Sequence, residues 1–331
     1  MIVFTSDDSV ANALNRTDPD LAVWAWSESL HMGSVERDYD LDAFAKRRAA
    51  SYRDWGWDEC VEVEADWTLR NDALMQGLAE GQEIGLLFGK GVRDQLPLAR
   101  ICGWLAAKAN HALDKVRLLN VDSSLTDRSD QWLSKAVSSA PPAGIEAIRQ
   151  YERVWEAFVS SDPKQLEGCW RSFGDGPLQE ALERLLREFP SSENGLSLTE
   201  CQILDALSLG IRSPRELFDR FSETEDPPFL NDWEFWLILE RMATGASPLI
   251  ELGDQENFLR PPNVMAWNAF HDQTLGLTQT GESVLKGSGN YAALDFQERW
   301  IGGCRVAKDN FWFWDYEARE LARTTPLASA P

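Results

Sequence analysis

The chain begins with MIVFTSDDSV (residues 1–10), where an apolar run gives way at once to small polar and acidic residues. A short apolar run of this kind is typical of a strand that is buried on both faces of a parallel sheet. The polar residues after it then lie at the carboxyl end of the strand, where open α/β sheets bind their ligands. In one interpretation, Asp7 or Asp8 caps the next helix. In the other, Ser6, Ser9 and the exposed amides hold a phosphate, with a cation to offset the two aspartates.

Three more runs of β-type residues follow, at 21–26, 84–88 and 116–121. Helical periodicity lies between and beside the four runs, at 9–14, 41–55, 65–78 and 94–107. Strands that alternate with helices pair in parallel through right-handed crossovers. We therefore expect residues 1–126 to form a Rossmann-like α/β domain with a parallel sheet.

From residue 127 the pattern is mainly helical. Residues 127–194 are expected to form a helical linker region, with a turn at SSAPPAG (138–144) because two prolines end a helix. Residues 195–325 contain three helical segments, one of which begins with Ser213 as N-cap and Pro214 at the first helical position. Two strand-like segments and a short helix follow, in PLIEL (248–252) and TLGLTQTGESVL (274–285). Three helices before two strands predict a winged-helix-like C-terminal domain.

Several segments together resemble a known family. They are LLFGKGVRDQLPLARICGWLA (86–106), FPSSENGLSLTECQILDAL (189–207), PFLNDWEFWLILERMA (228–243), and Trp300 with the glycine pair 302–303. These pieces are similar to the bacterial DUF1835 family, in which an N-terminal domain precedes a helical, winged-helix-like region. The resemblance covers most of the chain and implies a fold, but no activity. Members often carry acidic or His residues before the Asp-Gln pair, whereas this chain has Gly89-Lys90-Gly91-Val92-Arg93.

Charge and composition argue against several classes of partner. The formal net charge is −22, from 54 acidic and 32 basic residues, and a surface of that sign repels phosphate backbones and anionic lipid. Residues 195–250 alone hold ten acidic and four basic side chains, which argues against a DNA-reading helix there. No apolar run is long enough to cross a membrane and no signal peptide is evident, so we expect a cytoplasmic protein.

The sequence offers no metal or common cofactor motif. The five Cys are odd in number and widely spaced, without Cys-x-x-Cys or a nearby His, so neither structural zinc nor a disulfide framework is expected. Gly-x-Gly-x-x-Gly and Walker motifs are also missing from the sequence. The sequence therefore predicts no metal site, and it leaves the cofactor and the oligomeric state open.

One pair of candidate catalytic residues lies in SESLHMG (27–33), directly after the second predicted strand. A His beside a carboxylate acts as a general base or orients a ligand, so Glu28 and His31 are candidates for these roles. The alternative for His31 is a structural histidine.

A second candidate region is FGKGVRDQ (88–95), after the third predicted strand. Its glycines allow a ligand close to the backbone, and Lys90 and Arg93 supply positive charge at the start of a helix. We expect Lys90, Arg93, Asp94 and Gln95 to bind ligand together with Ser6, Asp7 and Ser9. The alternative is a plain turn in which Asp94 caps the helix and Gln95 faces the core.

Three functions fit these features. The leading hypothesis is a binding protein, regulatory or adaptor in character, whose α/β domain takes a small anionic ligand or a protein partner. The competing hypothesis is an enzyme that acts on a nucleotide or sugar-phosphate-like molecule. In it His31 is the acid/base, Asp7 or Asp8 orients His31 or holds a divalent ion, and Lys90 stabilises negative charge. The third is a transcriptional regulator, which rests on fold analogy alone.

Overall fold

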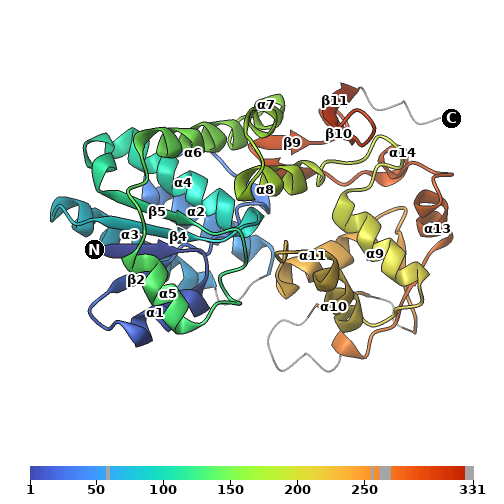
Figure 1. Cartoon of the computed structure of the whole chain (residues 1–331). Coiled ribbons are helices and arrows are strands. Elements are labelled where there is room, and N and C mark those ends of the chain that lie inside the picture. The colour runs from blue at the N-terminus through green and yellow to red at the C-terminus, as the bar shows by residue number, and fades with distance from the viewer. Residues whose placement is uncertain (57–59, 255–256, 261–269, 325–331) are drawn as a thin grey trace. The chain divides into compact units, whose positions relative to one another are not determined.

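The computed structural model describes the whole chain except residues 57–59, 255–256, 261–269 and 325–331. It groups the chain into two compact units (Figure 1). The first is Met1–Arg184 with Gly302–Cys304, and the second is Leu185–Ile301 with Arg305–Pro331. Most of the predicted linker region (127–194) is therefore grouped with the first unit. In the described part of the chain, no helix combines the length and apolar character needed to cross a bilayer.

The first unit is built on a four-stranded parallel sheet with the strand order β2-β1-β4-β5. Its strands are β1 (Ile2–Thr5), β2 (Ala22–Ala25), β4 (Ile84–Phe88) and β5 (Val116–Asn120). The predicted α/β domain with a parallel sheet is confirmed. The chain adds β2 on one side of β1, then adds β4 and β5 on the other. The order therefore reverses between β1 and β4, which is where ligands bind in open sheets of this kind.

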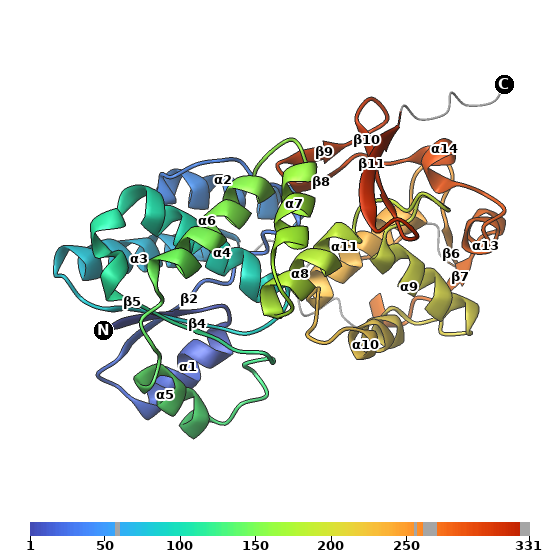
Figure 2. The same ribbon diagram turned by 45° about the horizontal axis from the view of Figure 1, so that its top comes forward.

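Helices cover both faces of the sheet. On one face, α1 (Asp8–Thr17) and α5 (Asp130–Ser138) pack on a buried core that includes Val3, Val23 and Leu87. On the other face lie α3 (Cys60–Ala79) and α4 (Val92–Lys108). Gly77 of α3 approaches the sheet so closely that a Cβ there would lie 2.9 Å from the Ile2 side chain. The separation of α1 and α5 from α4 is visible in Figure 2.

The remaining elements of the first unit pack outside these layers. They are β3 (Gly33–Ser34), α2 (Leu41–Asp54), the 3-10 helix η1 (Asn110–Lys115), α6 (Ile145–Phe158) and α7 (Lys164–Ser172), and α8 (Pro177–Leu186) follows them. The glycine pair 302–303 belongs with this unit. A Cβ on Gly302 would lie 2.2 Å from the Phe158 carbonyl, and one on Gly303 would lie 2.1 Å from the Val159 carbonyl. Both positions therefore require glycine.

The second unit is mostly helical. Its elements are α9 (Leu198–Ser208), α10 (Pro214–Thr224), α11 (Asp232–Ala243), β6 (Ile250–Leu252), β7 (Leu275–Leu277), α13 (Gln279–Leu285), α14 (Tyr291–Asp295), β10 (Phe311–Asp315) and β11 (Glu320–Thr324). The strands β8 (Arg299–Gly302) and β9 (Cys304–Val306) are divided between the two units, because Gly302–Cys304 belongs to the first. Strands β6 and β7 pair antiparallel, as do β10 and β11. The predicted N-caps of α9 and α10, Ser197 and Ser213, are confirmed.

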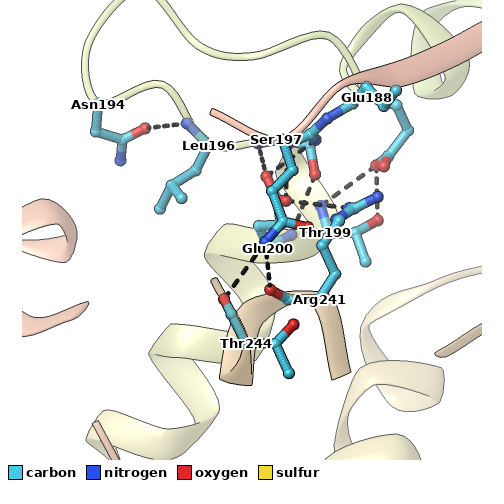
Figure 3. Close-up of polar contacts among 10 residues, drawn as sticks. Glu188, Asn194, Leu196, Ser197, Thr199, Glu200, Arg241 and Thr244 are labelled. Carbon is cyan, nitrogen blue, oxygen red and sulfur yellow. Dashed lines mark hydrogen bonds and ion pairs between the residues drawn. The ribbon is translucent and has the colours of Figure 1, made fainter. Parts of the chain in front are cut away.

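A buried carboxylate organises the start of α9 (Figure 3). Glu200 accepts hydrogen bonds from Arg299 at 2.9 and 3.1 Å, from Arg241 at 3.1 Å, and from the Ser197 backbone N–H at 2.8 Å. Burial alone would raise the pKa of Glu200, but the charges of Arg299 and Arg241 outweigh it and lower the pKa to about 2. The ionised form of Glu200 thus stabilises the second unit.

We predict that Glu200→Gln lowers the free energy of unfolding at pH 7 by about 3–5 kcal/mol, because it leaves two arginines without their counter-charge. The wild type should lose this stability as the pH falls from about 4.5, the usual carboxyl value, to about 2. Denaturant unfolding followed by Trp fluorescence measures both effects. The control Glu223→Gln removes an exposed ion pair with Arg220 and should change the free energy by less than about 1 kcal/mol. Equal effects of the two variants would contradict the prediction.

Candidate functional site

The candidate site lies at the carboxyl edge of the parallel sheet, where the strand-end loops are joined by backbone hydrogen bonds. The Trp26 N–H donates to the Thr5 carbonyl at 2.6 Å, which links the ends of β2 and β1. The Lys90 N–H donates to the Ser123 carbonyl at 3.3 Å, which links the loops after β4 and β5. Residues from four separate segments therefore share one edge.

Ser6 and Asp94 meet at the point where the strand order reverses. The Ser6 hydroxyl and the Gly89 N–H both donate to Oδ1 of Asp94, at 2.5 and 2.8 Å. Burial raises the pKa of Asp94 to about 6, although these two hydrogen bonds lower it in part. A carboxyl group with a pKa near neutrality in a strand-end site is a candidate for binding or proton transfer. The sequence FGKGVRDQ (88–95) did not by itself indicate that the pKa of Asp94 would be raised.

The loop after β4 presents the open start of α4. Gly91 is the N-cap of this helix, with φ of 104°, and no side chain caps the helix there. Lys90 and Arg93 lie on the same turn and are half-buried. The glycine before them is also constrained, since a Cβ on Gly89 would lie 2.7 Å from the Ser123 carbonyl. The turn therefore combines positive side chains with the positive end of a helix.

Asp7 and Ser9 serve the neighbouring helix. Oδ1 of Asp7 accepts from the N–H groups of Ser9 at 2.7 Å and Val10 at 3.4 Å, so Asp7 caps α1. The Ser9 hydroxyl also donates to Asp7. Asp8 stands on the same turn, where burial raises its pKa and a hydrogen bond with Ser27 lowers it in part. The helix-capping interpretation of the opening segment thus describes Asp7, while Ser6 faces the loop after β4.

Gln95 has a structural role at the same edge. It is buried and donates to the Gly89 carbonyl at 2.6 Å and to Oδ1 of Asn120 at 2.7 Å, while the Tyr151 hydroxyl donates to its oxygen at 3.0 Å. These bonds fix the loop after β4 against β5 and α6. Gln95 therefore holds Gly89 and Asp94 in position and uses its own polar atoms to do so.

Glu28 and His31 both lie in the interior, 2% and 6% exposed. Arg70 donates to Oε1 of Glu28 at 2.8 Å, and Nε of Arg100 lies 3.4 Å from Oε2. Burial alone would raise the pKa of Glu28, but Arg70 and Arg100 outweigh it and lower the pKa. Sequence reasoning missed both arginines, because they stand on helices far away in the chain. The catalytic role of Glu28 and His31 stays a prediction.

Other reactive groups are few. Within the residues that the structure describes, no cluster of His, Cys, Asp and Glu is suited to a metal ion. Four cysteines are free thiols, and burial raises the pKa of Cys102, Cys169 and Cys201. A raised pKa keeps these thiols protonated and unreactive at neutral pH.

No family model, no curated protein and no solved structure matches this chain. The similarity to DUF1835 therefore stays a prediction, and the function has to be argued from the site itself.

We predict that Asp94→Asn removes a pH dependence of stability. The folded-state pKa of Asp94, about 6, lies above its usual value of 3.8. Its contribution to stability is therefore complete below about pH 4 and declines as the pH rises through about 6. Asn keeps the oxygen that accepts from Ser6 and Gly89 but does not ionise. The melting temperature of wild type relative to Asp94→Asn should fall between pH 4 and pH 7, and parallel curves for the two proteins would rule this out.

Proposed function

We propose that the first unit binds a small anionic molecule at the carboxyl edge of its sheet, between the ends of β1 and β4. The observation that carries the proposal is the start of α4, which has Gly91 as N-cap and no side-chain cap. At the neighbouring helix α1, by contrast, the carboxylate of Asp7 already accepts from the first amides. An anion at α4 would receive the amide hydrogen bonds that Asp7 receives from α1.

Side chains at this turn suit an anion in a chain that is otherwise acidic. Lys90 and Arg93 flank Gly91, and the Ser6 hydroxyl lies at the same edge through its bond to Asp94. A bound anion would also favour the protonated form of Asp94, whose pKa of about 6 makes protonation accessible. Anion binding should therefore strengthen as the pH falls from 7 to 5.

The test is a calorimetric titration with inorganic phosphate, adenosine monophosphate and ribose 5-phosphate. We predict saturable binding of at least one of them, which Arg93→Ala weakens by about tenfold, the usual cost of a charge-assisted hydrogen bond. Lys115→Ala is the matched control, because it removes one positive charge at the opposite edge of the sheet, where Lys115 contacts the Gly81 carbonyl. Equal losses in the two variants, or no binding to the wild type, would refute the proposal.

An enzymatic function at the same edge is the second candidate. Asp94 favours it, because a carboxyl group with a pKa of about 6 exchanges protons efficiently near neutral pH. In this version Asp94 joins His31 as a candidate acid/base, Lys90 stabilises negative charge, and the substrate is a nucleotide or sugar phosphate. Turnover of a bound ligand, abolished in Asp94→Asn with binding retained, would distinguish an enzyme from a binding protein.

For the second unit we propose a winged-helix-like region that makes protein contacts. Its support is the order α9, α10, α11, β6 and β7, with β6 and β7 antiparallel, together with the Leu275 N–H that donates to the Arg212 carbonyl between α9 and α10 at 2.8 Å. The outer side of α11 is covered within its own unit, since Arg260 pairs with Glu240 at 2.7 Å and lies over the Trp233 ring. A covered, acidic helix does not suit base reading.

We predict that the full-length protein does not bind duplex DNA. Residues 195–250 contain ten acidic and four basic side chains. Few cations are therefore available to bind the DNA phosphates, and the more numerous carboxylates repel them. Fluorescence anisotropy with a labelled 25-base-pair duplex at low salt measures this. A dissociation constant below about 1 μM, tighter than the usual non-specific range, would revive the transcriptional hypothesis.

A further inference from the structure

A second cluster of polar groups lies in the interior of the first unit, away from the turn at Gly91. Its members are Glu28, Arg48, Arg70 and Arg100, none of them more than 2% exposed. Arg70 and Arg100 pair with Glu28, and the charge of Arg48 acts on it as well. Buried charges are normally balanced by partners of opposite sign, and Glu28 supplies one negative charge to the two arginines that pair with it.

The hydrogen bonds of the cluster leave specific donors unused. Arg48 donates to the carbonyls of Ser29, Met32 and Ser34, at 2.8, 2.9 and 3.0 Å. Within the part of the chain that the structure describes, Arg70 donates only through Nη2, to Glu28 and to Asn71. Within the described residues, Nε and Nη1 of Arg70 and Nε and Nη2 of Arg100 make no hydrogen bond. Buried N–H groups without a hydrogen-bond acceptor are rare in native proteins, and each calls for an explanation.

Among the described residues, the carboxylates around Glu28 do not use these donors, and of these donors Glu28 itself approaches only Nε of Arg100, at 3.4 Å from its Oε2. Asp8 lies near enough to act on Arg70 electrostatically, and Asp38 acts on Arg100 in the same way. Asp8, however, is hydrogen-bonded with Ser27, and Asp38 accepts from Arg47 and from the Asp40 N–H. The unused donors of the two buried arginines therefore remain available to another acceptor.

Aromatic rings hold the two guanidinium groups in place. The Arg70 Cζ lies 3.9 Å from the centre of the Trp26 ring, and the Arg100 Cζ lies 3.3 Å from the centre of the Phe44 ring. A ring against the face of a guanidinium leaves its edge, which carries the N–H groups, for acceptors. A planar pair of oxygens, as in a carboxylate or a phosphate, fits such an edge.

A pocket adjoins the cluster through Arg48, which belongs to both, and through Phe44, whose ring lies against Arg100. Its volume is about 240 Å³, and it is lined by Ser34, Glu36, Phe44, Arg47, Arg48, Ala50, Ser51 and Asp54. With about 30 Å³ for each water in the liquid, the pocket has room for a small organic anion.

We propose that the buried arginine cluster is an anion-binding subsite, which takes the carboxylate or phosphate group of a small molecule that enters through the pocket beside α2. The anion would accept hydrogen bonds from Arg70 and Arg100. This subsite is independent of the proposed function at Gly91, because it involves none of the residues of that turn.

The test is a calorimetric and thermal-shift titration of the full-length protein with acetate and with inorganic phosphate, at constant ionic strength set by sodium chloride. It is carried out in the Arg93→Ala variant, so that loss of the site at Gly91 does not affect the outcome. We expect saturable binding and a raised melting temperature with at least one of the two anions, compared with chloride. Acetate alone would identify a carboxylate site, and phosphate alone a phosphate site.

Two variants place the binding. Ala50→Leu narrows the pocket without replacing any arginine and should weaken binding by about tenfold or more. Ala43→Leu, on the same helix but outside the pocket lining, should leave binding unchanged. Arg100→Lys keeps the positive charge but removes the paired N–H donors of the guanidinium group. It should weaken anion binding to a similar extent. If Arg100→Lys does not fold, the comparison of Ala50→Leu with Ala43→Leu still tests whether the anion binds through the pocket. No binding beyond chloride, or equal binding by the two alanine variants, would overturn the proposal and leave a purely structural cluster.

Discussion

The ion pairs of Glu28 connect the loop after β2 to the two helices α3 and α4 on one face of the N-terminal sheet. Glu28 follows β2, and its partners Arg70 and Arg100 stand on α3 and α4, the two helices on one face of the sheet. One carboxylate therefore joins a strand end to two helices. Removing it would leave buried guanidinium groups without a counter-charge, which is more costly than never having formed the pair. The placement of the loop after β2 against α3 and α4 depends on this interaction.

The topology explains why the other polar groups gather nearby. Because all four strands are parallel, their carboxyl ends and the loops after them share one edge, and the reversal between β1 and β4 brings Ser6 to Asp94. The same edge thus holds a carboxyl group of raised pKa and the open start of α4, with Lys90 and Arg93 on its first turn. In a chain with a net charge of −22, such a concentration of donors is a local exception, and it supports recognition of an anion.

Much of the fold follows from the sequence alone, while the partners of the site residues do not. The apolar runs at β1, β2, β4 and β5 and the cap at Ser197 depend on neighbouring residues, so local pattern reveals them. The partners of Glu28 come from distant helices, and the pKa of Asp94 depends on burial, which no local spacing encodes. The sequence identified Asp7 and Gln95 as ligand candidates, yet their polar atoms serve α1 and the loop after β4. Long-range ion pairs and burial are properties of the folded chain.

The most direct test of the central claim, that the edge between β1 and β4 binds an anion, is a backbone amide NMR titration of the full-length protein with inorganic phosphate. The account predicts saturable shifts of the amide signals of Gly91, Val92 and Arg93, at the open start of α4, with smaller changes at Ser6. Shifts confined to other regions, or no shifts at phosphate concentrations well above those of cells, would contradict it.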